Sequence, residues 1–285
     1  MLYKGRRQSS NVEDRRGMSS GKKIGIGGGI GTIVIVLIVA LLGGDPGQVL
    51  NVMQEGQGTG TTQSDYQPSA HEQELAEFVS VVLADTEDVW HKLFEASGLT
   101  YREPTLVLFN SSTQSACGFA QAATGPFYCP GDEKVYIDLN FMEQLQKQLG
   151  AQGDFAMAYI VAHEVGHYVQ KLLGVLDKVH NLRGQVSEKE YNAQTVRLEL
   201  QADFYAGIWA YYAQKMKNIL ENGDIEEAMN AAQAVGDDRI QKRSQGYVVP
   251  DSFTHGTSAQ RMYWFKKGFT TGNVEEGNTF DRDAV

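Results

Sequence analysis

An uncharged run of 19 residues, rich in Ile, Val and Gly, occupies residues 24–42. As a helix rising about 1.5 Å per residue it would be about 28 Å long, enough to cross the apolar core of a bilayer. Residues 1–23 carry seven Lys or Arg against two Asp or Glu, whereas no Lys or Arg follows closely after the run. The positive-inside rule therefore predicts one transmembrane helix, with residues 1–23 as a basic cytoplasmic leader.

A cleaved signal peptide is the alternative interpretation of this segment. The apolar core of a signal peptide is usually about 7–15 residues, however, and its basic leader is short. Small residues within the run also favour close packing of membrane helices, which predicts a homo-oligomer. Residues 43–69 are rich in Gly, Gln, Thr and Ser, a composition typical of a flexible linker.

Apolar residues at regular spacing resume after the linker and continue for roughly 200 residues, the length of one domain. Within Ala70–Ala96 they recur every three or four positions, which predicts a helix. The run Thr-Leu-Val-Leu-Phe predicts a strand at residues 104–110. Residues 126–129 and 135–138 predict a hairpin around a Pro-Gly turn. Helical patterns dominate the remainder of the domain.

The domain predicted at residues 70–271 is therefore mostly helical α+β with a small sheet, and residues 272–285 form a polar tail. The chain has a net charge of −10, and outside the leader it holds 18 basic and 33 acidic residues. This acidity argues against binding to nucleic acid, since such binding depends on neutralising phosphates. It also argues against close contact of the domain with anionic lipid.

The most informative motif is His-Glu-Val-Gly-His, at His163, Glu164 and His167. Asp154 is a candidate cap at the start of the predicted helix that carries it, and Gly174 a candidate stop. Two His four residues apart on a helix can bind one zinc ion, and the Glu beside them can act as general base on a zinc-activated water. The alternative, a buried Glu between two core His, would be costly without a metal or partner.

The third zinc ligand must come from another part of the chain. Glu199 and Asp203 lie four residues apart in an apolar helical pattern, so both can face the same way. Glu199 is predicted to ligate the zinc, and Asp203 to accept the other ring N–H of a ligating His. The competing ligands lie in a polar stretch: Glu188, Glu190 and His180.

The two cysteines of the chain, Cys117 and Cys129, are twelve residues apart. The membrane prediction places the domain outside the cytoplasm of a bacterial cell, at its inner membrane. Because thiols are oxidised in such compartments, a disulfide between the two cysteines is expected there.

These motifs resemble the bacterial neutral zinc metallopeptidases of the YpfJ-like family, and more widely the gluzincins. The resemblance covers nearly the whole chain, and the matching stretches are residues 116–118, 125–130, 163–167, 198–203 and 255–261. It implies a zincin-like domain that holds one Zn²⁺ and hydrolyses peptide bonds. The late Thr-His, followed six residues later by Arg261, is similar to a motif of membrane-bound gluzincins, in which a late His or Tyr helps to stabilise the oxyanion.

His255 is accordingly the first candidate for oxyanion stabilisation, and Arg261 for orienting a nearby carboxylate. Tyr168, Tyr191 and Tyr205 are further candidates for the oxyanion role, although the pattern favours packing for all three. The function predicted is that of a membrane-anchored zinc metalloendopeptidase acting on peptides or proteins, with membrane lipid as its second partner. The alternatives are a membrane-tethered adaptor that keeps zinc only for structure, and a purely structural anchor protein.

Overall fold

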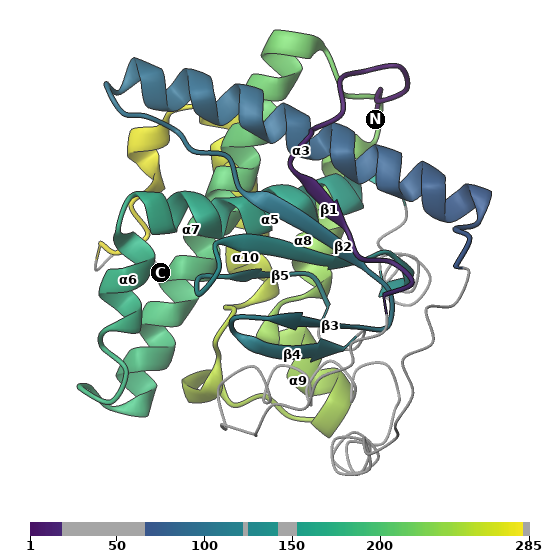
Figure 1. Ribbon diagram of the computed structural model, residues 1–285. Coiled ribbons are helices and arrows are strands. Elements are labelled where there is room, and N and C mark those ends of the chain that lie inside the picture. The colour runs from purple at the N-terminus through teal and green to yellow at the C-terminus, as the bar shows by residue number, and fades with distance from the viewer. Residues whose placement is uncertain (19–65, 122–124, 142–152, 282–285) are drawn as a thin grey trace.

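The sheet of the computed structural model has the strand order β1-β2-β6-β5 (Figure 1). The first three strands are mutually parallel, whereas β5 lies antiparallel to β6 at the edge. Their bounds are β1 Val12–Asp14, β2 Thr105–Phe109, β6 Lys134–Asp138 and β5 Phe127–Cys129. A separate hairpin consists of β3 (Ser112–Ser115) and β4 (Gly118–Gln121). The structure describes residues 1–18, 66–121, 125–141 and 153–281.

The predicted strand and hairpin are present. Strand β2 is apolar after Thr105, and Leu106, Val107 and Leu108 are buried, as expected for a central strand covered on both faces. Strands β5 and β6 pair with Tyr128 opposite Val135. The sequence pattern missed β1, β3 and β4, because these strands of three or four residues hold few apolar side chains.

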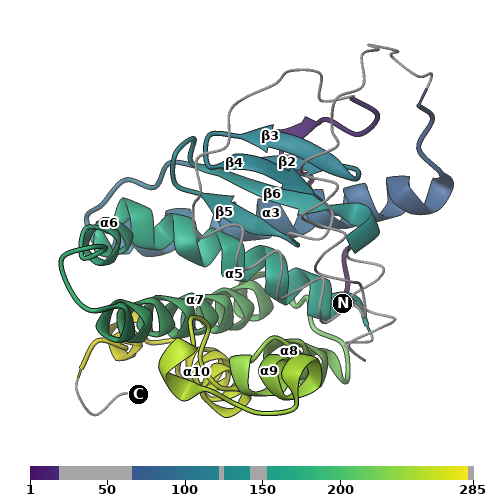
Figure 2. The ribbon, with the colours of Figure 1, turned by 90° about the horizontal axis from the view of Figure 1, so that it is seen from below.

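Helices form the rest of the molecule, and Figure 2 shows the sheet, α5, α7 and then α10 with α8 and α9 in successive layers. The predicted helix Ala70–Ala96 is α3, and Ser69 and Glu72 form a capping box at its start. The other helices are α5 Asp154–Leu172, α6 Val175–His180, α7 Glu188–Lys217, α8 Asp224–Ala234, α9 Asp237–Gln245 and α10 Ser258–Thr271, with the short 3₁₀ turns η2 Pro250–Ser252 and η3 Val274–Gly277.

The start of α5 differs from the prediction. Gly153 is the N-cap residue and makes no side-chain cap, whereas Asp154 is already the first helical residue. The backbone N–H of Phe155, which has no partner within the helix, instead donates at 3.0 Å to a carboxylate oxygen of Glu227, which reaches it from α8. A side chain from a distant element therefore replaces the local cap that the sequence predicted.

Residues 1–18 pack into the same body as the rest of the structure, although the sequence predicted a separate leader at residues 1–23. Strand β1 extends the sheet through its pairing with β2, and the segment around it lies along α3 (Figure 1). Within residues 1–18, the basic side chains that predicted a cytoplasmic flank are engaged in ion pairs, among them Arg6 with Asp85 and Arg7 with Glu87.

The end of the chain is also more ordered than a polar tail. Gly277 is buried, and its carbonyl oxygen accepts a hydrogen bond from Nε2 of Gln201 at 3.0 Å. Arg197 donates to the carbonyl oxygen of Thr279 at 2.6 Å. The domain therefore continues beyond residue 271 to the last described residues.

The predicted transmembrane helix at residues 24–42 and most of the predicted linker lie outside the described residues. Within the part of the chain that the structure describes, no helix combines the length and apolarity needed to cross a membrane.

Candidate metal centre

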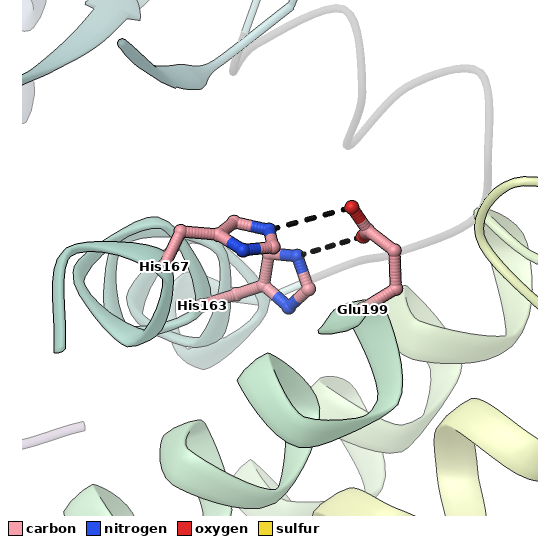
Figure 3. Close-up of side chains that lie close together, drawn as sticks. All are labelled: His163, His167 and Glu199. Atoms are coloured by element: carbon pink, nitrogen blue, oxygen red, sulfur yellow. Dashed lines mark ion pairs between the residues drawn. The ribbon is translucent and has the colours of Figure 1, made fainter. Parts of the chain in front are cut away.

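Two imidazoles and one carboxylate converge between α5 and α7 (Figure 3). Nε2 of His163 lies 3.3 Å from Oε2 of Glu199, and Nε2 of His167 lies 3.4 Å from Oε1 of the same residue. The two His are one turn apart on α5, so both rings project from one face. The structure thus brings together the three side chains that the sequence predicted as metal ligands.

A close approach of the two helices sets this geometry. Gly166, inside the motif, lies against Ala202 of α7, and a Cβ at position 166 would be 3.1 Å from the carbonyl oxygen of Ala202. A larger residue would push the helix axes apart. The glycine therefore allows Glu199, less than one turn before Ala202, to reach both imidazoles.

The three side chains fit zinc in chemistry and in spacing. Zinc binds imidazole nitrogen and carboxylate oxygen at about 2.0–2.2 Å in a tetrahedron, which places neighbouring donors about 3.4 Å apart. The ligand atoms of His163, His167 and Glu199 all lie within 4.8 Å of one another. Three protein donors leave the fourth position for water or substrate, as in catalytic zinc sites.

The electrostatics of the site favour a charged Glu199. Burial raises the pKa of this carboxyl, but the charge of His167 and hydrogen bonds from both imidazoles outweigh burial and hold the pKa well below its usual range. The His167 and Glu199 side chains remain 13% and 15% exposed. The ligands are therefore mostly buried, but one side of the site reaches solvent.

Asp203 orients the His163 ring, as the sequence predicted. Its Oδ1 lies 2.8 Å from Nδ1 of His163, so Nε2 is left facing Glu199. Burial lowers the pKa of His163, but the charge of Asp203 and the hydrogen bonds to Asp203 and Glu199 outweigh it and raise the pKa to about 9. Without a metal, this imidazole is therefore an imidazolium near neutral pH.

Arg261 supports Asp203 from the opposite side. Its Nε and Nη2 donate to the two oxygens of Asp203 at 2.8 and 2.9 Å, a bidentate pair that is almost fully buried. The hydroxyl of Tyr159 also bonds to Asp203. Burial raises the pKa of Asp203, but the charges of Arg261 and His163 outweigh it and hold the pKa below its usual range.

Arg261 reaches this position because α10 packs closely on α7. Cβ atoms at Gly207 and Gly268 would lie 2.1 Å from the carbonyl oxygen of Phe265 and 2.2 Å from that of Phe204. Only glycine fits at both points. The two helices therefore touch backbone to backbone, which brings the first turns of α10 to the metal centre.

The second His has a partner that the sequence analysis missed. Nδ1 of His167 lies 2.9 Å from Oε1 of Gln170, which is completely buried. The amide of Gln170 donates in turn to the carbonyl oxygen of Leu198 and to Oε1 of Gln201. An amide oxygen can only accept a hydrogen bond, so this contact fixes the proton on Nδ1 and leaves Nε2 for a metal. The sequence did contain a signal for this contact, because residues three apart on a helix, such as His167 and Gln170, are neighbours.

His255 lies near the metal centre, on the turn before α10. Its charge and that of Glu199 affect each other's pKa. Burial lowers the pKa of His255, but the hydrogen bond to Asp237 and the charge of Glu199 outweigh it and raise the pKa. The side chain is 26% exposed, so it can meet a ligand from solvent.

Asp237, at the start of α9, was not predicted from the sequence and holds the His255 turn. One oxygen accepts the backbone N–H groups of Thr254, His255 and Gly256 at 2.8, 2.6 and 3.0 Å. The other lies 3.1 Å from Nδ1 of His255. This network fixes the ring and leaves its Nε2 for other contacts.

The remaining candidates do not join the three ligands. Glu190 is exposed and caps α7 through Ser187, and Glu188 is exposed in the same turn. His180 is exposed at the end of α6. The alternative oxyanion donors Tyr168 and Tyr205 are buried in the core, and burial raises the pKa of Tyr205 to about 12.

The predicted disulfide is present between Cys117 and Cys129, with an S–S distance of 2.08 Å. It joins the turn of the β3–β4 hairpin to the end of strand β5. Strand β5 is the sheet edge that lies over α5 in Figure 2. The disulfide therefore anchors the strand that lies nearest to α5, the helix of His163 and His167.

Comparison with known proteins agrees with this chemistry. The family model described as "Putative neutral zinc metallopeptidase" matches residues 1–280. The chain is 50% identical over 287 residues to the uncharacterized protein YpfJ of Escherichia coli (strain K12), covering 99% of each chain. It is 39% identical over 255 residues to the uncharacterized protein Rv2575 of Mycobacterium tuberculosis (strain ATCC 25618 / H37Rv), covering 84% of each. No solved structure matches the chain.

Proposed function

Because the chain belongs to the neutral zinc metallopeptidase family, we propose that it is a zinc-dependent endopeptidase with one Zn²⁺ per chain. The proposal rests above all on Glu199, whose two oxygens lie 3.3 and 3.4 Å from the Nε2 atoms of His163 and His167. This arrangement supplies three ligands and leaves one position open. A purely structural zinc site usually has four protein ligands.

Zinc held by these ligands would act as a Lewis acid and lower the pKa of a water at the open position to about 7. Glu164 follows His163 on α5 and is partly exposed. In the proposed mechanism it accepts the proton of the attacking water and later delivers that proton to the amine leaving group. His255, held by Asp237, stabilises the negative charge on the carbonyl oxygen.

The substrate proposed is an extended segment of a peptide or protein. Among the strands that the structure describes, β5 pairs with β6 alone and lies at the edge of the sheet. An extended peptide could pair with this edge through its backbone while its scissile bond lies over α5. Backbone pairing is independent of side-chain identity, which is consistent with an endopeptidase of broad preference.

We place the active domain outside the reducing cytoplasm. The Cys117–Cys129 disulfide supports this location, because such bonds persist in oxidising compartments. The apolar run at residues 24–42 supports an association with the bacterial inner membrane.

Replacement of Glu164 by Gln tests the mechanism. Glu164→Gln removes the base but no ligand, so the variant should keep one zinc per chain and lose cleavage of an unfolded protein substrate by about 10²-fold or more. Glu188→Gln, an exposed change on α7, is the matched control and should retain full activity. Wild-type protein that holds zinc and cleaves nothing, or a Glu164→Gln variant as active as wild type, would refute the mechanism.

A further inference from the structure

Residues 1–18 supply hydrogen-bond partners to a carboxylate buried on α3. Glu87 is 1% exposed. It accepts hydrogen bonds from the hydroxyl of Ser9, from Nδ2 of Asn11 at 2.9 Å and from Nη1 of Arg7 at 2.9 Å. A buried carboxylate without such partners would be strongly destabilising. The fold therefore tolerates a buried carboxylate at Glu87 because the amino-terminal segment supplies its hydrogen-bond partners.

A second buried carboxylate on the same helix repeats the pattern. Asp85 is also 1% exposed. Nη2 of Arg6 donates to it at 2.6 Å, and Nζ of Lys217 donates at 2.8 Å. The segment thus brings positive charge to the part of α3 where Asp85 and Glu87 are buried.

Backbone pairing ties the same segment to the sheet. Leu106 donates its N–H to the carbonyl oxygen of Asn11 at 2.8 Å, and Arg15 donates to that of Leu108 at 2.8 Å. Glu13 forms an ion pair with Lys134 of β6 at 2.7 Å. Strand β1 therefore covers an edge of β2 that would otherwise present unpaired backbone groups.

We infer that residues 1–18 and the metal centre lie in the same compartment. The contacts with Glu87, Asp85 and β2 require the segment and the domain to fold together. A single membrane crossing between them, with residues 1–23 in the cytoplasm, would separate the two. The Arg residues that favour that orientation by the positive-inside rule are instead partners of acidic groups in the fold. This inference is independent of the proposed peptidase activity.

Cysteine labelling in cells tests the compartment directly. Lys4→Cys and Lys189→Cys each place one thiol at an exposed site, where the native side chains are 76% and 70% exposed. Spheroplasts that produce each full-length variant are treated with a membrane-impermeant maleimide, with the parent chain as baseline. We expect both added thiols to react, or both to react only after lysis. Reaction of one in intact spheroplasts and of the other only after lysis would overturn the inference.

A pair of neighbouring serines tests the docking itself. Ser9 is 8% exposed and bonds to Glu87, whereas Ser10 is exposed. In purified full-length protein, Ser9→Ala should lower the Tm by about 3–10 °C, since it removes a partner of a buried charge. Ser10→Ala should leave the Tm unchanged. Equal Tm values for both variants would show that the segment is not docked, and would overturn the inference irrespective of any catalytic result.

Discussion

Gly166 of α5 packs against the backbone of Ala202 of α7, between the two helices that carry the candidate metal ligands. A Cβ at position 166 would lie 3.1 Å from the carbonyl oxygen of Ala202. This oxygen belongs to the backbone, so it cannot rotate away as a side chain could. Glycine at position 166 therefore sets the distance between α5 and α7. The same contact sets the distance from Glu199 to both imidazoles.

Replacing Gly166 with Ala should move the helices apart by a few tenths of an ångström. Because the change shifts a ligand without removing one, we expect zinc affinity to fall about 10-fold or more. Competition with a chromophoric chelator measures the affinity, and far-UV circular dichroism checks that the helices persist. Unchanged affinity in a folded variant would show that the contact does not set the ligand geometry.

Glu199 and Asp203 should respond differently to substitution. Glu199→Ala removes one of three ligands and should abolish stoichiometric zinc binding. Asp203→Asn keeps the ligands and changes only the partner of His163, so its affinity should fall by about 10–100-fold. Metal analysis of the purified variants distinguishes the two. Full zinc occupancy in Glu199→Ala would mean that the third ligand is another residue.

Gln170 should matter for zinc although it does not touch the metal position. Gln170→Leu removes the acceptor at Nδ1 of His167 and leaves the ring free to adopt the wrong tautomer, so zinc affinity should fall about 10-fold. The matched control is Gln185→Leu, because Gln185 is exposed. Equal affinities for the two variants would contradict a role of Gln170 in orienting His167.

Asp237 should affect turnover more than metal binding. Asp237→Ala releases the three backbone N–H groups and the His255 ring that it now holds. If His255 stabilises the oxyanion, kcat should fall by about 10²-fold, as for the loss of an oxyanion donor. Zinc content should stay at one per chain. A variant that keeps wild-type kcat would exclude His255 from the reaction.

The sequence alone predicted those parts of the site that depend on spacing within one helix. His163 and His167 are four residues apart, as are Glu199 and Asp203, and helical geometry then places each pair on one face. Asp237 and Gln170 could not be assigned in the same way. An Asp–His contact across 18 residues depends on how α9 packs against the following turn, and a buried Gln has no motif of its own.

The sequence predicted a separate leader at residues 1–23, whereas residues 1–18 pack into the domain, and this difference has a physical reason. A cluster of Arg beside an apolar run has the same composition whether it faces a cytoplasm or pairs with buried acids. Asp85 and Glu87 belong to a run of four polar residues, 85–88, which in the sequence resembles an exposed stretch of helix, although both side chains are buried in the structure. Their partners, Arg6 and Arg7, are about 80 residues away in the chain, and the fold alone connects them.

Zinc binding should strengthen as the pH rises towards 9. In the metal-free site the pKa of His163 is raised from 6.5 to about 9, so below pH 9 its proton must leave when zinc binds at Nε2. That single proton should make the affinity rise about tenfold per pH unit up to pH 9 and then level off. The raised pKa of His163 also stabilises the metal-free fold. This contribution is fully present below pH 6.5 and is lost as the pH rises through about 9.

The control variant is Asp203→Asn, in which the charge that outweighs burial is absent. The pH range over which zinc affinity rises tenfold per unit should therefore end at a lower pH in this variant. Chelator competition at several pH values, with proton release by calorimetry in two buffers, measures both. A pH-independent affinity between pH 7 and 9 in the wild-type chain, or the same range in both chains, would contradict the assignment of this proton to His163 and Asp203.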